Sequence, residues 1–292
     1  MYTDDQIIEC HGSCALEYLK NKNTGGGNSA RGNDYENKFA VCEMTLAARR
    51  YFDLNEVKRF FTQARAYVDD LVIVYNGEYS HYQIKDVKNL SWGSGEKSLT
   101  DDFQKQYELN FHNGIDTQTI LVVSIDSLCE SLSSKIPDSI SKFTSVKLFH
   151  NKNLDSYISD EQIKNALIIL SSRKSPTLAD LNNLFMYIYG CWYKCESHKG
   201  ISNEQFIELL REYENAYMRL PSFKLDENFE KLLSTIPDFD FDTDKGYLNW
   251  NYGRTDSGVV RYPCNSIEFR EWQSRVIKKN PEDFNDLEEV LL

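Results

Sequence analysis

The sequence predicts an α/β fold in which a mixed sheet is flanked by helices and followed by a mainly helical C-terminal region. The clearest observation is a pair of strand-like segments, 67–75 and 78–87, joined by Asn76-Gly77, the strongest short signal for a hairpin turn. A second observation is that helical and strand patterns alternate around this hairpin. A third is that helical patterns dominate after about residue 155.

The region before the hairpin is predicted to contain a loop and then a helix. Residues 1–31 are polar and end in a glycine-rich stretch, so they read as a flexible loop; no Gly-Lys-Ser/Thr follows, which excludes a P-loop. A helix is expected to begin near Asn33, where Asn33-x-x-Glu36 has the form of a capping box. Apolar residues then recur at steps of three and four: Tyr35, Phe39, Cys42 and Leu46. The segment 57–66 is compatible with a helix or a strand.

The region after the hairpin continues the alternation as far as about residue 150. The expected elements are a loop at 91–98, helices at 101–111 and 127–135, and strands at 119–125 and 144–150. Helices are then expected at 160–171, 178–195, 203–218, 228–234, 266–278 and 281–291, while 238–262 is compatible with a small hairpin. We therefore expect two domains, a sheet-containing domain at 1–155 and a mainly helical region at 156–292.

Composition excludes several classes of protein. The chain of 292 residues has no run of 18 apolar residues and begins with an acidic stretch, so we expect a cytoplasmic protein with no membrane span and no secretion signal. Seven scattered cysteines argue against a disulfide framework. Two local clusters, Cys10-His11-x-x-Cys14 and Cys191 to His198, lack the tight paired spacing of a zinc site.

The charge of the chain bears on nucleic-acid binding. The net charge is −12, and neither half is basic. A constitutive DNA-binding protein usually carries a basic surface, so this composition argues against one. It remains compatible with an enzyme whose carboxylates hold metal ions, or with one that needs a partner or an assembly to hold DNA.

The hairpin places several polar residues on one face. If Asn76-Gly77 forms a two-residue loop, Tyr75 pairs with Glu78, and counting back places Asp70 opposite Gln83. Because side chains alternate along a strand, Asp70, Gln83 and Lys85 share a face, with Lys85 diagonal to Asp70. The same alternation assigns Asp69 to the other face.

These residue types are suited to phosphodiester cleavage. Asp70 and Gln83 offer side-chain oxygens to a Mg²⁺ ion, and the backbone carbonyl of Ile84 can add another. Lys85 can orient a water molecule or stabilise developing negative charge, and Glu36 from the preceding helix can complete the metal ligands. The simpler alternatives are a solvated sheet face and, for Glu36, a helix cap.

These residues also carry a family resemblance. The run Gly32-Asn33-Asp34-Tyr35-Glu36, then Asp70, then Gln83-Ile84-Lys85 resembles the PD-(D/E)XK nuclease superfamily, and Gln-x-Lys resembles its Mrr-type variant. Within it, the chain is similar to the nuclease domains of bacterial anti-phage effectors of CBASS and Lamassu systems. The resemblance covers roughly 30–150. It implies a restriction-endonuclease-like fold, metal binding by Asp70 and Gln83, catalysis by Lys85, and metal or water support from Glu36.

The function expected from this resemblance is Mg²⁺- or Mn²⁺-dependent cleavage of double-stranded DNA. The protein would be a regulated effector of anti-phage defence, active as a homo-oligomer or with an SMC-like or other ATPase or sensor subunit, and 156–292 would mediate assembly. Two alternatives remain open. One is a catalytically silent subunit that keeps the nuclease fold and docks onto a larger complex; the other is a nuclease for RNA or free nucleotides.

Overall fold

The computed structural model describes residues 2–25, 30–173, 175–212, 218, 225–243, 246–253, 256–264 and 266–291. The chain forms two compact units, Met1–Met218 and Arg219–Leu292. The first unit contains every residue that the sequence proposes for the site, so most of the following concerns it.

The first unit is built on a six-stranded mixed sheet with the order β5-β4-β3-β2-β1-β6. The strands are β1 (Arg59–Thr62), β2 (Leu71–Tyr75), β3 (Glu78–Lys85), β4 (Thr117–Val123), β5 (Thr144–Leu148) and β6 (Ile201–Ser202). Strands β1, β2 and β3 pair antiparallel, β4 and β5 continue the sheet in parallel, and β6 pairs antiparallel with β1. The predicted mixed α/β fold is therefore confirmed, and the ambiguous segment 57–66 contains a strand.

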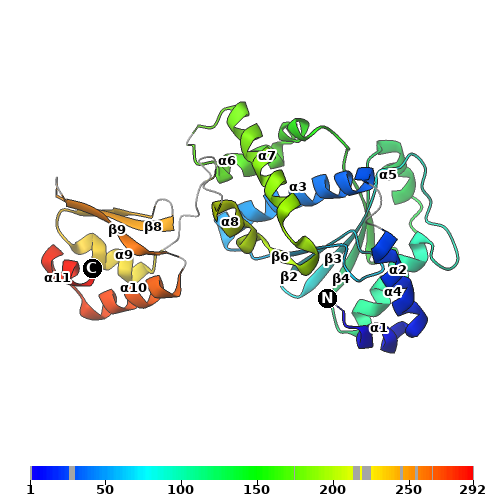
Figure 1. Ribbon diagram of the computed structural model, residues 1–292, viewed down its shortest axis with the longest axis horizontal. Coiled ribbons are helices and arrows are strands. Elements are labelled where there is room, and N and C mark those ends of the chain that lie inside the picture. The colour runs from blue at the N-terminus through cyan, green and yellow to red at the C-terminus, as the bar shows by residue number, and fades with distance from the viewer. Residues whose placement is uncertain are drawn as a thin grey trace. The chain divides into compact units, whose positions relative to one another are not determined.

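Helices cover both faces of this sheet (Figure 1). One face is packed by α3 (Ala30–Leu54), α6 (Glu161–Leu170), α7 (Leu178–Lys194) and α8 (Asn203–Glu212). The other is packed by α1 (Asp4–His11), α2 (Ser13–Gly25), α4 (Leu99–His112) and α5 (Asp126–Ser133). Short 3₁₀ helices, η2 (Leu154–Ser159) and η3 (Ser197–Lys199), lie in the connections.

The N-terminal region differs from its prediction. Helices α1 and α2 occupy most of the segment expected to be a flexible loop, and 26–29 lie outside the described residues. Thr3 forms a complete capping box with Gln6 at the start of α1. These polar residues therefore begin a helix where the sequence predicts a loop. Helix α3 begins at Ala30, so Asn33 lies inside it and does not cap it.

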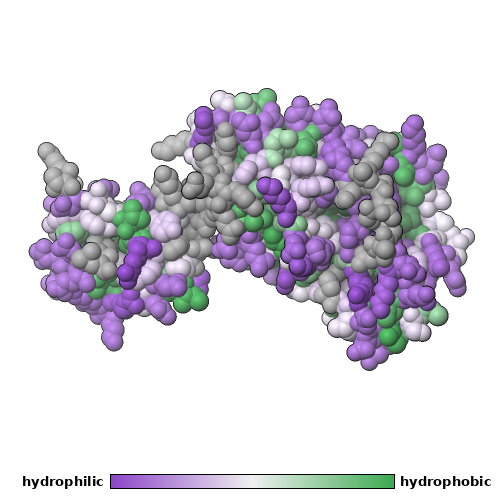
Figure 2. Space-filling view, in the orientation of Figure 1, coloured by the Kyte–Doolittle hydropathy of each residue, from purple (hydrophilic) through white to green (hydrophobic). Residues whose placement is uncertain are grey.

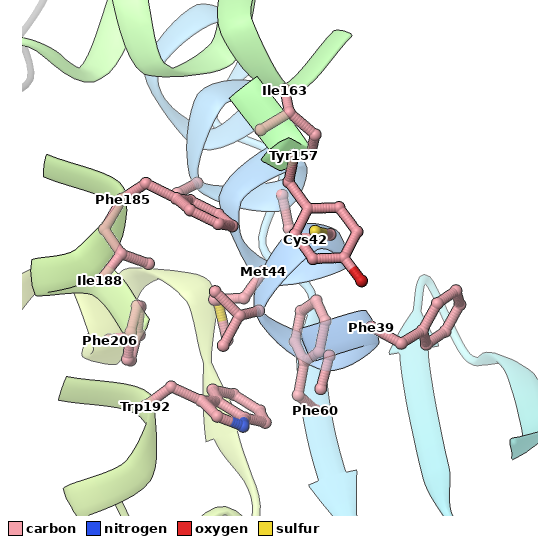
Figure 3. Close-up of a cluster of buried hydrophobic side chains, with 14 of the residues drawn as sticks. Phe39, Cys42, Met44, Phe60, Tyr157, Ile163, Phe185, Ile188, Trp192 and Phe206 are labelled. Carbon is pink, nitrogen blue, oxygen red and sulfur yellow. The ribbon is translucent and has the colours of Figure 1, made fainter. Parts of the chain in front are cut away.

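The largest core lies between α3 and the helices that follow the sheet. Figure 3 shows aromatic side chains from β1, α7 and α8 meeting beside Met44 of α3. The Trp192 ring lies 6.3 Å from that of Phe60 and 6.0 Å from that of Phe206, in edge-to-face geometry. The Trp192 indole also donates to Asn37 on α3 at 3.1 Å. These contacts bind α7 and α8 to the sheet.

This core explains where the chain divides. The sequence places a domain boundary between 155 and 156, but α6, α7 and α8 cover the apolar face of α3 and belong to the first unit. The structure therefore moves the division to Met218 and Arg219. The shift in pattern near residue 155 marks the end of the parallel strands, after which the chain adds helices to the same core.

The second unit has its own small core. It consists of α9 (Glu227–Thr235), β7 (Phe239–Asp242), β8 (Tyr247–Tyr252), β9 (Asp256–Pro263), α10 (Ile267–Lys279) and α11 (Phe284–Leu291). Its three strands form an antiparallel sheet, which includes the small hairpin compatible with 238–262. Phe229 and Trp272 lie at the centre of its core.

The face visible in Figure 2 is mainly hydrophilic, with hydrophobic residues in separate small groups. Within the described ranges, none of the helices combines the length and the apolar character needed to cross a membrane.

Candidate active site

The β2–β3 hairpin has the register expected from its turn. Tyr75 pairs with Glu78, and Leu71 pairs with Tyr82. The first strand is shorter than predicted, because β2 begins at Leu71 rather than at residue 67. Residues 67–70 precede the strand as an irregular, buried segment, so Asp70 stands at the point where regular pairing ends.

One carboxylate oxygen collects three of the predicted residues. Oδ2 of Asp70 accepts hydrogen bonds from Nε2 of Gln83 at 2.5 Å, from the backbone N–H of Ile84 at 2.7 Å and from Nζ of Lys85 at 3.2 Å. The Asp70 side chain is 8% exposed and that of Lys85 is 34% exposed. The prediction that Asp70, Gln83 and Lys85 lie together is confirmed. Oδ1 of Asp70 receives no hydrogen bond from any residue that the structure describes.

The backbone N–H and C=O groups of Ile84 also point toward Asp70 and the beginning of β2. In an antiparallel ladder, every second residue of a strand points its N–H and C=O groups toward one neighbouring strand, and the residues between them point theirs the other way. Tyr82 pairs with Leu71 of β2, and Ile84 lies two residues further along β3, on the same side. The hydrogen bond from Ile84 to Asp70 agrees with this direction. The carbonyl of Ile84 therefore also faces the end of β2.

Glu36 reaches the site from α3. Its Oε2 accepts a hydrogen bond from Nε2 of Gln63 at 2.9 Å. Burial, and then the charge of Asp70, raise the pKa of Glu36 to about 8, while Lys85 acts in the opposite direction. Glu36 lies six positions inside α3, so the alternative that it caps the helix is wrong. Glu36 lies close enough to Asp70 for the negative charge of Asp70 to raise its pKa.

Gln63 is a site neighbour that the sequence analysis did not identify. It follows β1 with a positive φ of 48°, a conformation that is uncommon for a residue other than glycine. Its backbone N–H donates to the carbonyl of Asp70 at 3.4 Å while its side chain holds Glu36. The segment 57–66 carried no motif, so no sequence signal pointed to it.

Asp69 also lies beside the site, contrary to the prediction from strand alternation. Its side chain is 5% exposed, its Oδ1 lies 3.7 Å from Nζ of Lys22, and that oxygen has no hydrogen-bond partner. Lys22 packs with the helices on the α4 face, whereas Leu71 lies in the core under α3. The alternation begins only at Leu71, so it does not govern Asp69. Burial raises the pKa of Asp69 to about 7, opposed by Lys22 and reinforced by Asp70.

The charges in this region suit a divalent cation. Four carboxylates, those of Glu36, Asp69, Asp70 and Asp102, are accompanied by the two ammonium groups of Lys22 and Lys85, a formal balance of −2 when all are ionised. Within the described ranges, no three Asp, Glu, His or Cys side chains are grouped so as to hold a metal. Mg²⁺ often binds through one or two carboxylates and keeps several waters, so Asp70, Glu36, the Gln83 amide and the Ile84 carbonyl fit its needs.

A separate cavity of about 670 Å³ lies at the other end of the hairpin. It lies between α3 and the strands, and Arg49, Tyr75, Glu78 and Tyr82 are among its lining residues. None of the candidate site residues lines it, so it does not bear on the chemistry around Asp70.

Comparison with known proteins gives no assignment. No protein-family model matches the chain, and no curated protein matches it as a relative. Among solved structures, it is similar to the Acinetobacter baumannii Cap4 SAVED/CARF-domain containing receptor, with 16% identity and a TM-score of 0.42, over 62% of this chain and 47% of that one. The same receptor with the cyclic trinucleotide 3'3'3'-cAAA gives 14% identity and a TM-score of 0.42, over 61% and 44%. The chain spans less than half of either structure, and similarity of this degree identifies neither a family nor a function.

Proposed function

We propose that this protein is a Mg²⁺-dependent endonuclease that hydrolyses phosphodiester bonds of double-stranded DNA. The observation that supports the proposal is the convergence of Gln83, Ile84 and Lys85 on one oxygen of Asp70. A partly buried lysine beside a carboxylate, an amide and a strand carbonyl provides both metal ligands and a cation for phosphate chemistry.

Each residue has a role in this proposal. Asp70 and Glu36 would hold the metal ion, together with the amide oxygen of Gln83 and the carbonyl of Ile84. The Gln83 amide has its nitrogen toward Asp70, and a half-turn of the amide group presents its oxygen at the same place. The bound metal would supply an activated water and neutralise charge on the phosphate. Lys85 would orient that water and stabilise the negative charge that develops on the phosphate oxygens.

We also propose that the nuclease is a regulated effector of bacterial anti-phage defence. This rests on the resemblance of the Glu36, Asp70 and Gln83-x-Lys85 pattern to the nuclease domains of such effectors. The net charge of −12 supports regulation, because an acidic chain binds DNA poorly unless assembly or a partner adds positive charge. An oligomer, or an SMC-like or other ATPase or sensor subunit, would meet this need.

The test is digestion of supercoiled plasmid by the full chain, alone and with the products of neighbouring genes. We expect nicked and linear DNA with Mg²⁺, none with EDTA, and a loss of at least about 100-fold in Lys85→Ala. Lys88→Ala is the matched control, since Lys88 is exposed just beyond β3. If no combination of partners gives Mg²⁺-dependent cleavage, the proposal is wrong. Parallel digests of linear DNA and total RNA distinguish a DNA nuclease from an RNA nuclease.

A second candidate is a catalytically silent subunit with a structural role. One observation favours it: Oδ2 of Asp70 already accepts three hydrogen bonds, which satisfies that oxygen without a metal. Calorimetry with Mn²⁺ separates the two candidates. Absence of metal binding together with stable association with a neighbouring gene product favours the silent subunit.

A further inference from the structure

The segment that carries Asp70 is buried without being part of the sheet. Residues 67–70 precede β2, and their exposed fractions are 1% for Tyr67, 0% for Val68, 4% for Asp69 and 7% for Asp70. Buried backbone N–H and C=O groups must find partners, because an unpaired group costs free energy comparable to a lost hydrogen bond. Outside a ladder, those partners must come from elsewhere, and they decide where Asp70 points.

Most of these partners come from the surrounding elements. Oε1 of Gln106 accepts from the N–H groups of Tyr67 at 2.9 Å and Val68 at 3.3 Å. The ring of His81 bonds the Val68 carbonyl through Nδ1 at 3.0 Å. Backbone N–H groups of Ala64 and Gln63 donate to the carbonyls of Asp69 at 3.0 Å and Asp70 at 3.4 Å. Every carbonyl of the segment except that of Tyr67 is thereby satisfied.

The Tyr67 carbonyl is bound by Lys22 of α2. Nζ of Lys22 donates to that oxygen and to Oδ2 of Asp102, the latter at 2.8 Å, and it lies 3.7 Å from Oδ1 of Asp69. The Lys22 side chain is 21% exposed and that of Asp102 is 7% exposed. Asp102 is fixed in turn by the hydroxyl of Tyr18 at 3.0 Å. One ammonium group thus joins α2, α4 and two residues of the irregular segment, Tyr67 and Asp69.

We propose that Lys22 is a positioning residue of the candidate active site, which holds the Tyr67 carbonyl and the Asp69 carboxylate and so directs Asp70 toward Ile84 and Gln83. The catalytic meaning of this role rests on the proposed nuclease function, but the positioning does not. Without the ammonium group, a buried carbonyl and a buried carboxylate lose their cation, and the segment relaxes. The N-terminal helices thereby form part of the site, although they precede the segment that resembles nucleases.

The direct readout is hydrogen exchange of the Ile84 amide, which donates to Asp70. In full-length Lys22→Met, we expect this amide to exchange at least about tenfold faster, the loss expected for one charge-assisted hydrogen bond. The amide of Tyr82, which pairs with Leu71 in the regular ladder, should keep its wild-type rate. Lys22→Arg, which restores a donor with positive charge, should return Ile84 to within about threefold of wild type.

The matched control is Lys20→Met, which removes a lysine from the same helix where it is exposed and pairs with Asp4. It should leave both amides unchanged. If Ile84 in Lys22→Met exchanges at the wild-type rate, or the Lys20 variant accelerates it equally, the proposal is overturned. If Lys22→Met unfolds, both amides accelerate together, and Asp102→Asn then gives the decisive comparison, because it weakens the anchor of Lys22 and keeps an acceptor for Tyr18.

Mn²⁺ binding by calorimetry links this role to the proposed function. We expect Lys22→Met to bind Mn²⁺ about 10- to 100-fold more weakly than wild type, as is typical when a residue that orients a metal ligand is lost. If wild-type protein binds no metal and cuts no DNA, yet the Ile84 amide accelerates in Lys22→Met, the nuclease proposal fails and the positioning role stands. If wild type cuts DNA and Lys22→Met cuts equally well with an unchanged Ile84 amide, the positioning role fails alone.

Discussion

The Ile84 amide donates to the side chain of Asp70 at 2.7 Å, where a regular ladder would give it a backbone acceptor. In the register of β2 and β3, the residue opposite Ile84 is Asp69. The carbonyl of Asp69 instead accepts from the Ala64 amide at 3.0 Å. The carboxylate of Asp70 therefore takes the place of the missing backbone acceptor. The loss of regular pairing between β2 and β3 at this point is also what positions that carboxylate.

Substituting this carboxylate should separate activity from stability. Asp70→Asn keeps the shape and an oxygen that can accept from Ile84, but it removes the negative charge that would bind the metal. We expect cleavage to fall by at least about 100-fold. The thermal midpoint should change little, because the loss of the Lys85 ion pair is offset by relief of repulsion with Glu36 and Asp69. A plasmid assay and thermal denaturation of the same preparation check this; a drop in the midpoint that accounts for the lost activity would contradict it.

The sequence was informative where local rules apply. The Asn76-Gly77 turn fixed the register, and that register correctly placed Gln83 and Lys85 near Asp70. Alternation failed at Asp69 because β2 begins only at Leu71. The residues before Leu71 are held instead by Gln106, His81 and Lys22, which come from distant parts of the chain.

Long-range packing also explains what the sequence could not give. The polar N-terminal segment folds as α1 and α2 because it packs on α4, and local composition gave no sign of this partner. Gln63 belongs to the site only because β1 lies beside β2. The residues between these two strands contain no turn motif that predicts their pairing. Both features depend on contacts between segments that are far apart in the sequence.

Glu36 should make the metal-free protein less stable as pH rises. Its pKa is raised from 4.5 to about 8 in the folded state, first by burial and then by Asp70. The contribution of Glu36 to the stability of the folded protein is therefore fully present below about pH 4.5 and is lost as pH rises through 8. Glu36→Gln removes this titration, so in EDTA the variant should be more stable than wild type at pH 8. The free energy of unfolding of the variant minus that of wild type should be larger at pH 8 than at pH 4.5 by roughly 1–4 kcal/mol. Urea denaturation at both pH values checks this, and parallel curves for the two proteins would be inconsistent with it.

His81 should make the fold sensitive to acid. Complete burial lowers its pKa from 6.5 to about 4, although the Val68 carbonyl favours the charged form. The stability that comes from keeping this ring neutral is complete above pH 6.5 and is lost as pH falls through 4, a change of about 3 kcal/mol. His81→Gln should flatten this dependence. The difference in urea midpoint between wild type and variant, measured from pH 7 to pH 4.5, isolates the histidine from the carboxylates that also titrate; a constant difference would count against this assignment.

The boundary of the first unit can be tested with fragments. Residues 1–155 contain the sheet strands β1 to β5 and α3, but they lack α6, α7 and α8, which cover the apolar face of α3. Phe60 would lose its contacts with Trp192, whose removal from a core alone typically costs about 3–5 kcal/mol. We expect the fragment 1–155 to lack a cooperative thermal transition, whereas 1–218 should unfold cooperatively by circular dichroism. Trp192→Ala in 1–218 should lower the midpoint strongly, and Tyr193→Ala, 72% exposed at the next position, should not. Cooperative unfolding of 1–155 at the same temperature as 1–218 would instead support a domain that ends near residue 155.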